Sequence, residues 1–176
     1  MRNELLVLAV FALLATSVVS SHFLPRADAA AADYYLKLGD IKGESTDGKH
    51  KDWIEIESFS FGVSTSISGG GGGGAGKAKF ADVSLVKTID KSSPNLFVES
   101  ASGKHYPTAE LVIVKSGVEV MKWTLSDIVI TSYQVNAGDA ILTDQFSLNF
   151  AKIVAEYNSS SGPVKMGWDI KTNKRV

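Results

Sequence analysis

The chain has 176 residues, of which 44% are hydrophobic, with a formal net charge of -1 and no cysteine. This length favours a single main domain. The near-neutral charge, without a cluster of lysine and arginine, argues against nucleic-acid binding, and the lack of cysteine excludes disulfides and thiolate metal sites.

Residues 1–29 have the order of features found in a secretory signal peptide. An apolar run at residues 5–19 is followed by a small-residue cleavage site ending at Ala29, with cleavage after Ser20 as the alternative. The apolar run is shorter than the ~20 residues of a membrane-spanning helix. We therefore expect export to the periplasm or the medium, with no stable membrane insertion after cleavage, and a mature domain at residues 30–176.

Most segments of the mature part alternate apolar and polar residues with a period close to two, which is typical of half-buried strands. Glycine, proline, asparagine and serine separate these segments. The expected strands cover residues 34–39, 53–63, 80–89, 109–116, 118–135, 144–157 and 164–172. The domain is therefore predicted to be mainly β.

Residues 41–51, "IKGESTDGKHK", form a connection between two predicted strands that is longer than the ~2 to 5 residues of most hairpin loops. We expect an extended loop here, and two interpretations stay open: a solvated excursion, or a contact surface. The candidate contact residues are Lys42, Glu44, Asp47, Lys49, His50 and Lys51. Their spacing matches neither a calcium loop nor a zinc-binding helix.

The stretch "SGGGGGGAGKAK" at residues 68–79 invites comparison with the phosphate-binding loop G-x-x-x-x-G-K-[ST]. Ala78 stands where that motif needs a hydroxyl for magnesium, and the following segment shows no helical periodicity. A flexible connector between two strands is the favoured interpretation. It comprises Gly69, Gly70, Gly71, Gly72, Gly73, Gly74 and Gly76.

One short helix is predicted after residue 91. Ser92 or Ser93 can cap it, Pro94 suits its first turn because the missing N–H costs nothing there, and Gly103 can end it. Leu96, Phe97 and Val98 are expected to face the sheet.

The segment 144–157 changes its apolar phase part-way along. Phe146, Leu148 and Phe150 share one phase, whereas Ile153 falls in the other. A bulge near Lys152, or a strand buried on both sides, would reconcile the two. Together these elements predict a small antiparallel β-barrel of two packed sheets, with the helix covering an open end or edge.

Catalytic and binding residues are not predicted from any motif. His105 could in principle act on Ser102 with a distant aspartate as its orienting group, but no local signature supports a triad. Trp53, Trp123 and Trp168 lie in alternating strands without a basic groove, which favours packing over base stacking. We expect no catalytic, cofactor-binding or metal-binding residues, and hence no enzyme.

Several separated motifs together resemble the haemolysin-coregulated protein family, the tube subunits of bacterial type VI secretion. They include "YYLKLGDIKGES", "AGKAKFADVSLVKTIDKSSPNLFVESASGKHYP", "FSLNFAKIVAEY" and "GPVKMGWDIKTNK". The resemblance covers residues 34–174. It implies a small β-barrel with one helix, assembled into homohexameric rings that stack into a hollow tube, propelled under a spike protein and able to carry effector proteins in its lumen. It also implies that the extended loop at residues 41–51 reaches a neighbouring subunit or the next ring, which makes its six candidate contact residues candidate stacking residues.

The signal peptide departs from the family pattern. Subunits of the cytoplasmic tube have no cleaved signal, because the sheath that drives the tube assembles around it inside the cell. Two functions therefore stay open: a self-assembling tube or scaffold protein, and a secreted non-enzymatic binding module that kept the barrel and left the secretion apparatus.

Overall fold

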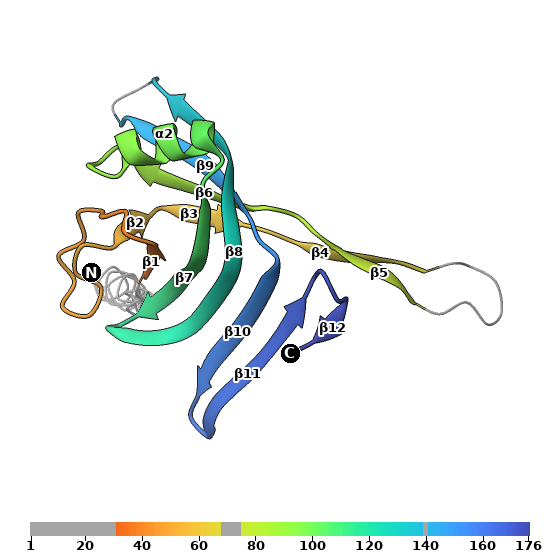
Figure 1. Ribbon diagram of the computed structural model, residues 1–176. Helices are drawn as coiled ribbons and strands as arrows, with labels where there is room; N and C mark the ends of the chain where they lie inside the picture. The colour runs from red at the N-terminus through yellow and green to blue at the C-terminus, as the bar shows by residue number, and fades with distance from the viewer. Residues whose placement is uncertain (1–30, 68–74, 139–140) are drawn as a thin grey trace, which may run out of the picture.

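A computed structural model describes residues 31–67, 75–138 and 141–176 (Figure 1). The predicted signal peptide at residues 1–29 lies outside these ranges and stays a prediction. The strands of the described part are β1 (Ala32–Leu38), β2 (Ile54–Ile56), β3 (Ser58–Ser60), β4 (Val63–Ile67), β5 (Ala75–Phe80), β6 (Val83–Thr88), β7 (His105–Lys115), β8 (Val118–Asn136), β9 (Thr143–Asn149), β10 (Lys152–Ser159), β11 (Gly162–Asp169) and β12 (Lys174–Arg175). The helix is α2 (Ser93–Ser102).

Strand β8 is the central strand of the sheet. It is 19 residues long, pairs along most of its length with β7, and pairs on its other side first with β10 and then with β9. From β7 the antiparallel sheet continues through β1 to β2, and from β9 through β6 to β3. Because β2 and β3 follow one another in the chain, the two ends of this curled sheet meet, which confirms the predicted antiparallel barrel architecture.

The hydrogen-bond ladder is not continuous around the barrel. Ile54 to Ile56 pair with β1, whereas Ser58 to Ser60 pair with β6, so the chain itself makes the link between the two ladders. Strands β10, β11 and β12 extend past the barrel as a wing, and β4 and β5 form a separate two-stranded sheet that projects from it (Figure 1). We refer to these two features as the wing and the arm.

The core is built from the inward positions of the alternating strands. Leu36 on β1 lies opposite Ile54 on β2 and Leu111 on β7, and each of these side chains is at most 1% exposed. Phe146 and Leu148 on β9 are fully buried on the facing side. Burial of one such side chain contributes about 1.5 to 3 kcal/mol, so this pattern determines which face of each strand turns inward.

The helix matches its predicted boundaries closely. Ser92 is the N-cap residue, Pro94 lies in the first turn, and Gly103 ends the helix with a left-handed φ of 65°. Of the three residues predicted to face the sheet, one is buried against it. Leu96 is fully buried, but Phe97 and Val98 are 60% and 57% exposed, because consecutive residues on a helix are about 100° apart and cannot share a face.

The phase change in residues 144–157 has a simple cause. Two strands, β9 and β10, replace the single predicted one, and both pair with β8 on either side of the break at Phe150 and Ala151. Phe150 is still buried against the core, and Ile153 begins the buried face of β10. The break between β9 and β10 therefore reconciles the two phases of buried side chains, which is the role expected of a bulge near Lys152.

Candidate functional site

The loop at residues 41–51 folds back onto its own chain. Backbone N–H groups of Gly43 and Ser45 donate to the carbonyl oxygens of Asp52 and Trp53, at 2.9 and 3.2 Å. Ser45 is 2% exposed, and a Cβ on Gly43 would lie 2.3 Å from the Trp53 carbonyl oxygen. The loop therefore has a defined path held close to β2, which a fully solvated excursion would not have.

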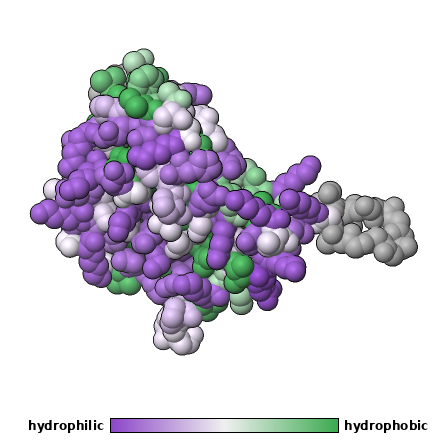
Figure 2. Space-filling model, viewed as in Figure 1, coloured by the Kyte–Doolittle hydropathy of each residue, from purple (hydrophilic) through white to green (hydrophobic). Residues whose placement is uncertain are grey.

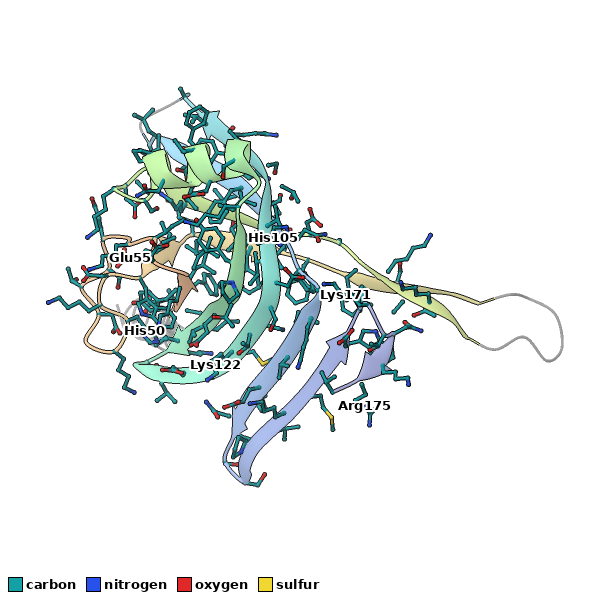
Figure 3. All side chains as sticks on the ribbon, in the orientation of Figure 1. His50, Glu55, His105, Lys122, Lys171 and Arg175 are labelled. Carbon is teal, nitrogen blue, oxygen red and sulfur yellow. The ribbon has the colours of Figure 1, made fainter. Side chains whose placement is uncertain are left out.

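His50 anchors this loop to the outer face of the sheet (Figure 3). Its side chain is 3% exposed, its Nδ1 lies 2.7 Å from Asp47 Oδ1, and its Nε2 lies 3.3 Å from Glu119 Oε1. The ring also packs edge-on to Trp53, with ring centroids 5.0 Å apart. Hydrogen bonds from the Lys49 backbone and from His50 hold the pKa of Asp47 below its ordinary value.

The six candidate stacking residues thus divide into two groups. His50 is buried within its own subunit and Asp47 is bonded to it, so both help to build the loop. The side chains that remain exposed are those of Lys42, Glu44, Lys49 and Lys51. Sequence reasoning missed the burial of His50 because the loop has no periodicity and its charges suggested a solvated face.

The arm is the most prominent projection of the molecule (Figure 1). Val63 pairs with Phe80 and Ser64 with Lys79, so β4 and β5 flank the glycine run as the two sides of a hairpin. Gly76 lies within β5, whereas Gly69 to Gly74 lie outside the described residues, and their role as a connector stays a prediction. The chain continues from β5 into strand β6, so the helix that a phosphate-binding loop needs does not follow.

The two faces of the arm differ in character. Val63 and Phe80 share one face, and Val63 is 59% exposed. Lys77 and Lys79, both exposed, lie on the opposite face of β5. The Ala78 N–H donates a hydrogen bond of 3.2 Å to Asn173 Oδ1, which lies between β11 and β12, and at the base of the arm the Phe80 ring packs edge-on to Phe150 with ring centroids 6.0 Å apart.

The wing carries an apolar face that continues the core into solvent. Tyr157 pairs with Val164 and Ala155 with Met166, which places these side chains in phase with the buried Ile153. Tyr157, Val164 and Met166 are 52%, 53% and 55% exposed. Trp123 and Trp168, on the same face nearer the barrel, are half-buried against the core.

A second apolar surface lies at the end of the molecule near α2 (Figure 2). The exposed side chains there come from the helix, the end of β8 and the two residues before β9, and they are Phe97, Val98, Val135, Ile141 and Leu142. The Phe97 ring packs against Tyr133, with centroids 5.9 Å apart. We call this surface the apolar cap.

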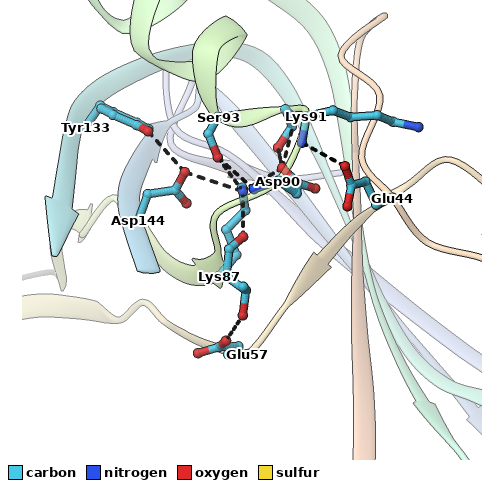
Figure 4. Close-up of polar contacts among 10 residues, drawn as sticks. Glu44, Glu57, Lys87, Asp90, Lys91, Ser93, Tyr133 and Asp144 are labelled. Carbon is cyan, nitrogen blue, oxygen red and sulfur yellow. Dashed lines mark hydrogen bonds and ion pairs between the residues drawn. The ribbon is translucent and has the colours of Figure 1, made fainter. Parts of the chain in front are cut away.

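A buried charge cluster holds the beginning of the helix (Figure 4). Lys87 is fully buried, and its Nζ lies 2.7 Å from Asp90 Oδ1, 2.9 Å from Ser93 Oγ and 3.4 Å from Asp144 Oδ2. Tyr133 donates to Asp144 Oδ2 at 3.1 Å. Burial opposes ionisation of Asp90, but hydrogen bonds from Lys87 and Ser92 outweigh it and lower its pKa.

His105 contacts an aspartate, but it does not contact the candidate nucleophile Ser102. Its Nδ1 lies 2.9 Å from Asp127 Oδ1, and the Lys171 Nζ donates to Asp127 Oδ2 at 2.6 Å (Figure 3). The Ser102 hydroxyl instead bonds to Glu99, and this exposed group makes no recorded contact with His105. Hydrogen bonds from Lys171 and then His105 lower the pKa of Asp127, which is the pattern of a surface charge network.

Among the described residues, no group of three or more His, Cys, Asp or Glu side chains is arranged to hold a metal ion. No helix among them is long and apolar enough to cross a membrane.

A family profile described as "Type VI secretion system effector, Hcp" matches residues 35–157. Protein hcp1 of Pseudomonas aeruginosa is 46% identical over 158 residues, which covers 81% of this chain and 98% of that protein. This chain belongs to the Hcp family. It is therefore a type VI secretion protein of the secreted tube type, as the sequence resemblance implied.

Solved structures agree with this assignment. Hcp1 from Salmonella typhimurium aligns with a TM-score of 0.74 and 33% identity, over 83% of this chain and 99% of that one. A type VI secretion system effector from Yersinia pestis aligns with a TM-score of 0.69 and 26% identity, over 78% of this chain and 100% of that one. The family description names a secretion component and no reaction.

Proposed function

We propose that this Hcp protein assembles into homohexameric rings, which stack into a hollow tube that transports effector proteins under a spike. In this account the protein acts through its shape and the surface of its lumen. Catalysis plays no part.

The observation that carries the proposal is the arm. An isolated two-stranded hairpin is at best marginally stable in water, and it needs a further strand or a packing surface. Within the described part of the chain, β4 and β5 pair only with each other. A neighbouring subunit would supply the missing surface.

The wing supports the same conclusion. Contiguous exposed apolar side chains on a sheet face favour association, because burying them removes apolar area from water. Tyr157, Val164 and Met166 form such a face directly beside the core. A head-to-tail contact that covers the wing of each subunit closes into a ring when its rotation permits.

Stacking of rings would use surfaces at the two ends of each ring. We assign the exposed residues Lys42, Glu44, Lys49 and Lys51 to such a contact, with His50 and Asp47 fixing the loop that presents them. Exposed ion pairs contribute only about 0 to 1 kcal/mol each, so they would set register more than affinity. The apolar cap would provide buried area for a further contact.

Export by a signal peptide at residues 1–29 would bring the protein to the periplasm or medium by a route of its own. The alternative function, a secreted binding module that has left the apparatus, differs in one observable respect. A module of this kind would stay monomeric or of low order. Native mass, followed by negative-stain microscopy of the purified exported protein, separates the two: rings and tubes support our proposal.

A further inference from the structure

An acidic groove of about 640 Å³ lies on the side of the barrel formed by β1 and β2. Five carboxylates contribute to its lining, and no lysine, arginine or histidine does so; the five are Asp33, Glu44, Glu55, Glu57 and Asp90. Asp90 is paired with the buried Lys87, and Glu44 accepts from the Lys91 backbone N–H at 3.2 Å. Asp33 and Glu55 have no recorded partner among the described residues.

Tyr35 gives this groove a second polar feature. Its side chain lines the groove and is 8% exposed, and among the described residues its hydroxyl has no recorded hydrogen bond. Burial raises the pKa of this hydroxyl, and the charges of Asp33, Asp47 and Glu55 raise it further. A hydroxyl at the tip of a largely buried side chain, among carboxylates, favours a positively charged occupant that can also donate hydrogen bonds.

The occupant is not a single metal ion. Ca²⁺ needs several oxygen ligands at about 2.3 to 2.6 Å, and no set of three suitable side chains in the described residues is arranged for this. Carboxylates dispersed along a groove instead suit several positive charges spaced along an extended chain.

The arm carries such charges. Lys77 and Lys79 are exposed, lie on one face of β5, and form no ion pair with any described residue. Residues two apart on a strand are separated by about 6.6 to 6.8 Å. The subunit therefore holds two unpaired, regularly spaced lysines and a groove whose charges are complementary to them.

The arm cannot fill the groove of its own subunit. Figure 1 shows the arm projecting away from β1 and β2. Figure 3 places Glu55 on the side of β1 and β2, far from the arm. We propose that Lys77 and Lys79 of one subunit dock into the groove at Asp33, Tyr35 and Glu55 of the next. This inference rests on the proposed function, and it identifies the contact by which neighbouring copies recognise one another.

A closed head-to-tail ring requires two complementary surfaces on opposite sides of each subunit. The arm and the acidic groove are placed in this way. Complementary charge across such a contact sets register and speeds encounter, and like charges facing one another disfavour it strongly. Assembly that uses this contact should therefore weaken as salt is raised, because the pairs lie in an open groove that solvent reaches.

Charge reversal of the arm tests the proposal. The arm variant carries Lys77→Glu and Lys79→Glu. The matched control carries Lys104→Glu and Lys115→Glu, two exposed lysines outside the arm, the wing and the loop at residues 41–51. The rescue variant adds Asp33→Lys and Glu55→Lys to the arm reversal. Analytical ultracentrifugation of the exported full-length product gives the concentration at half-assembly, and urea unfolding checks that each subunit is folded. We expect the arm variant to need at least about 100-fold more protein, the control to match wild type, and the rescue variant to recover most of the loss.

The outcomes separate this inference from the function on which it rests. A wild-type protein that stays monomeric at high micromolar concentration would overturn both. Wild type and arm variant assembling at the same concentration would overturn the docking contact alone. A folded rescue variant that assembles no better than the arm variant would also overturn the contact, because direct pairing requires that exchanged charges compensate.

Discussion

The imidazole ring of His50 lies flat against the phenol ring of Tyr35, with ring centroids 4.6 Å apart and 3° between their planes. Tyr35 also packs with the buried Val112 and Val114 on the outer face of the sheet, and Trp53 lies against this cluster. The loop at residues 41–51 therefore acts as a cover for an outer apolar cluster, in addition to any role in stacking.

Removal of this ring should destabilise the subunit. His50→Ala leaves a cavity beside Tyr35 and leaves Asp47 and Glu119 without their shared partner, so we expect a loss of about 2 to 4 kcal/mol in the free energy of unfolding. Urea unfolding measures it. Lys49→Ala, an exposed neighbour, is the control and should stay within about 0.5 kcal/mol of wild type. Equal values for the two variants would show that His50 does not anchor the loop.

Two glycines of the same loop form a matched pair. A Cβ on Gly43 would lie 2.3 Å from the Trp53 carbonyl oxygen and 2.5 Å from Ile54 Cα, whereas a Cβ on Gly48 meets nothing within 4 Å. Gly43→Ala should therefore cost about 1 to 3 kcal/mol, because the clash is with backbone that cannot swing away. Gly48→Ala should be close to neutral. Thermal unfolding of both proteins decides the matter, and a stable Gly43→Ala protein would contradict the path of the loop.

The exposed loop charges test the stacking assignment. Lys42, Lys49 and Lys51 can be replaced by alanine together without touching the buried Ile41, Ser45 or His50. We expect single rings to persist and tubes to be lost at high protein concentration, as seen by negative-stain microscopy. Replacement of the whole loop would be uninformative, because it would also uncover Tyr35. Tubes of normal length in the triple variant would show that these lysines are only solvated.

The buried charge of Lys87 should be the most sensitive polar position near the helix. Lys87→Met leaves Asp90 and Asp144 without their cation in a buried site, and breaking such a pair costs about 3 to 5 kcal/mol. Adding Asp144→Asn to Lys87→Met should cost less than the sum of the two single changes, because both act on one cluster. Urea unfolding of the three variants tests this, and strict additivity would contradict the coupling.

The lowered pKa of Asp90 predicts an acid dependence of stability. A carboxyl group whose pKa is lower in the folded state stabilises the fold above its unfolded pKa of about 3.9, and this contribution disappears as the pH falls through the folded value. Asp90→Asn should therefore differ most from wild type near neutral pH and least at strongly acid pH. A constant difference in unfolding free energy across this range would show that ionised Asp90 is not stabilised by the fold.

Alternation of apolar residues predicted most of the strands, because each strand has one buried face. The same alternation contains the signal for Lys87, which lies in phase with the buried Val83 and Leu85. A lysine at an inward position on a strand indicates a buried ion pair. One partner, Asp90, lies three residues further on, before α2, whereas the other, Asp144 on β9, cannot be located without the fold.

The projecting element was harder to predict. Length and charge pointed to residues 41–51, yet the larger projection is the arm, whose strands carry few large apolar residues and flank a glycine run. Apart from Phe80 at its base and the hydrogen bond from Ala78, the arm makes few contacts in its own subunit, so its strands carry little pattern of burial in the sequence. The tertiary contacts of His50 are likewise invisible there, because they join the loop to β1 and to the start of β8.

The central claim is that the protein is a ring-forming tube subunit, and the native mass of the exported protein tests it most directly. Sedimentation equilibrium across micromolar concentrations should give a closed species six times the mass of one chain, which dissociates as salt is raised. A single species with the mass of one chain throughout that range would contradict the account and favour a monomeric binding module.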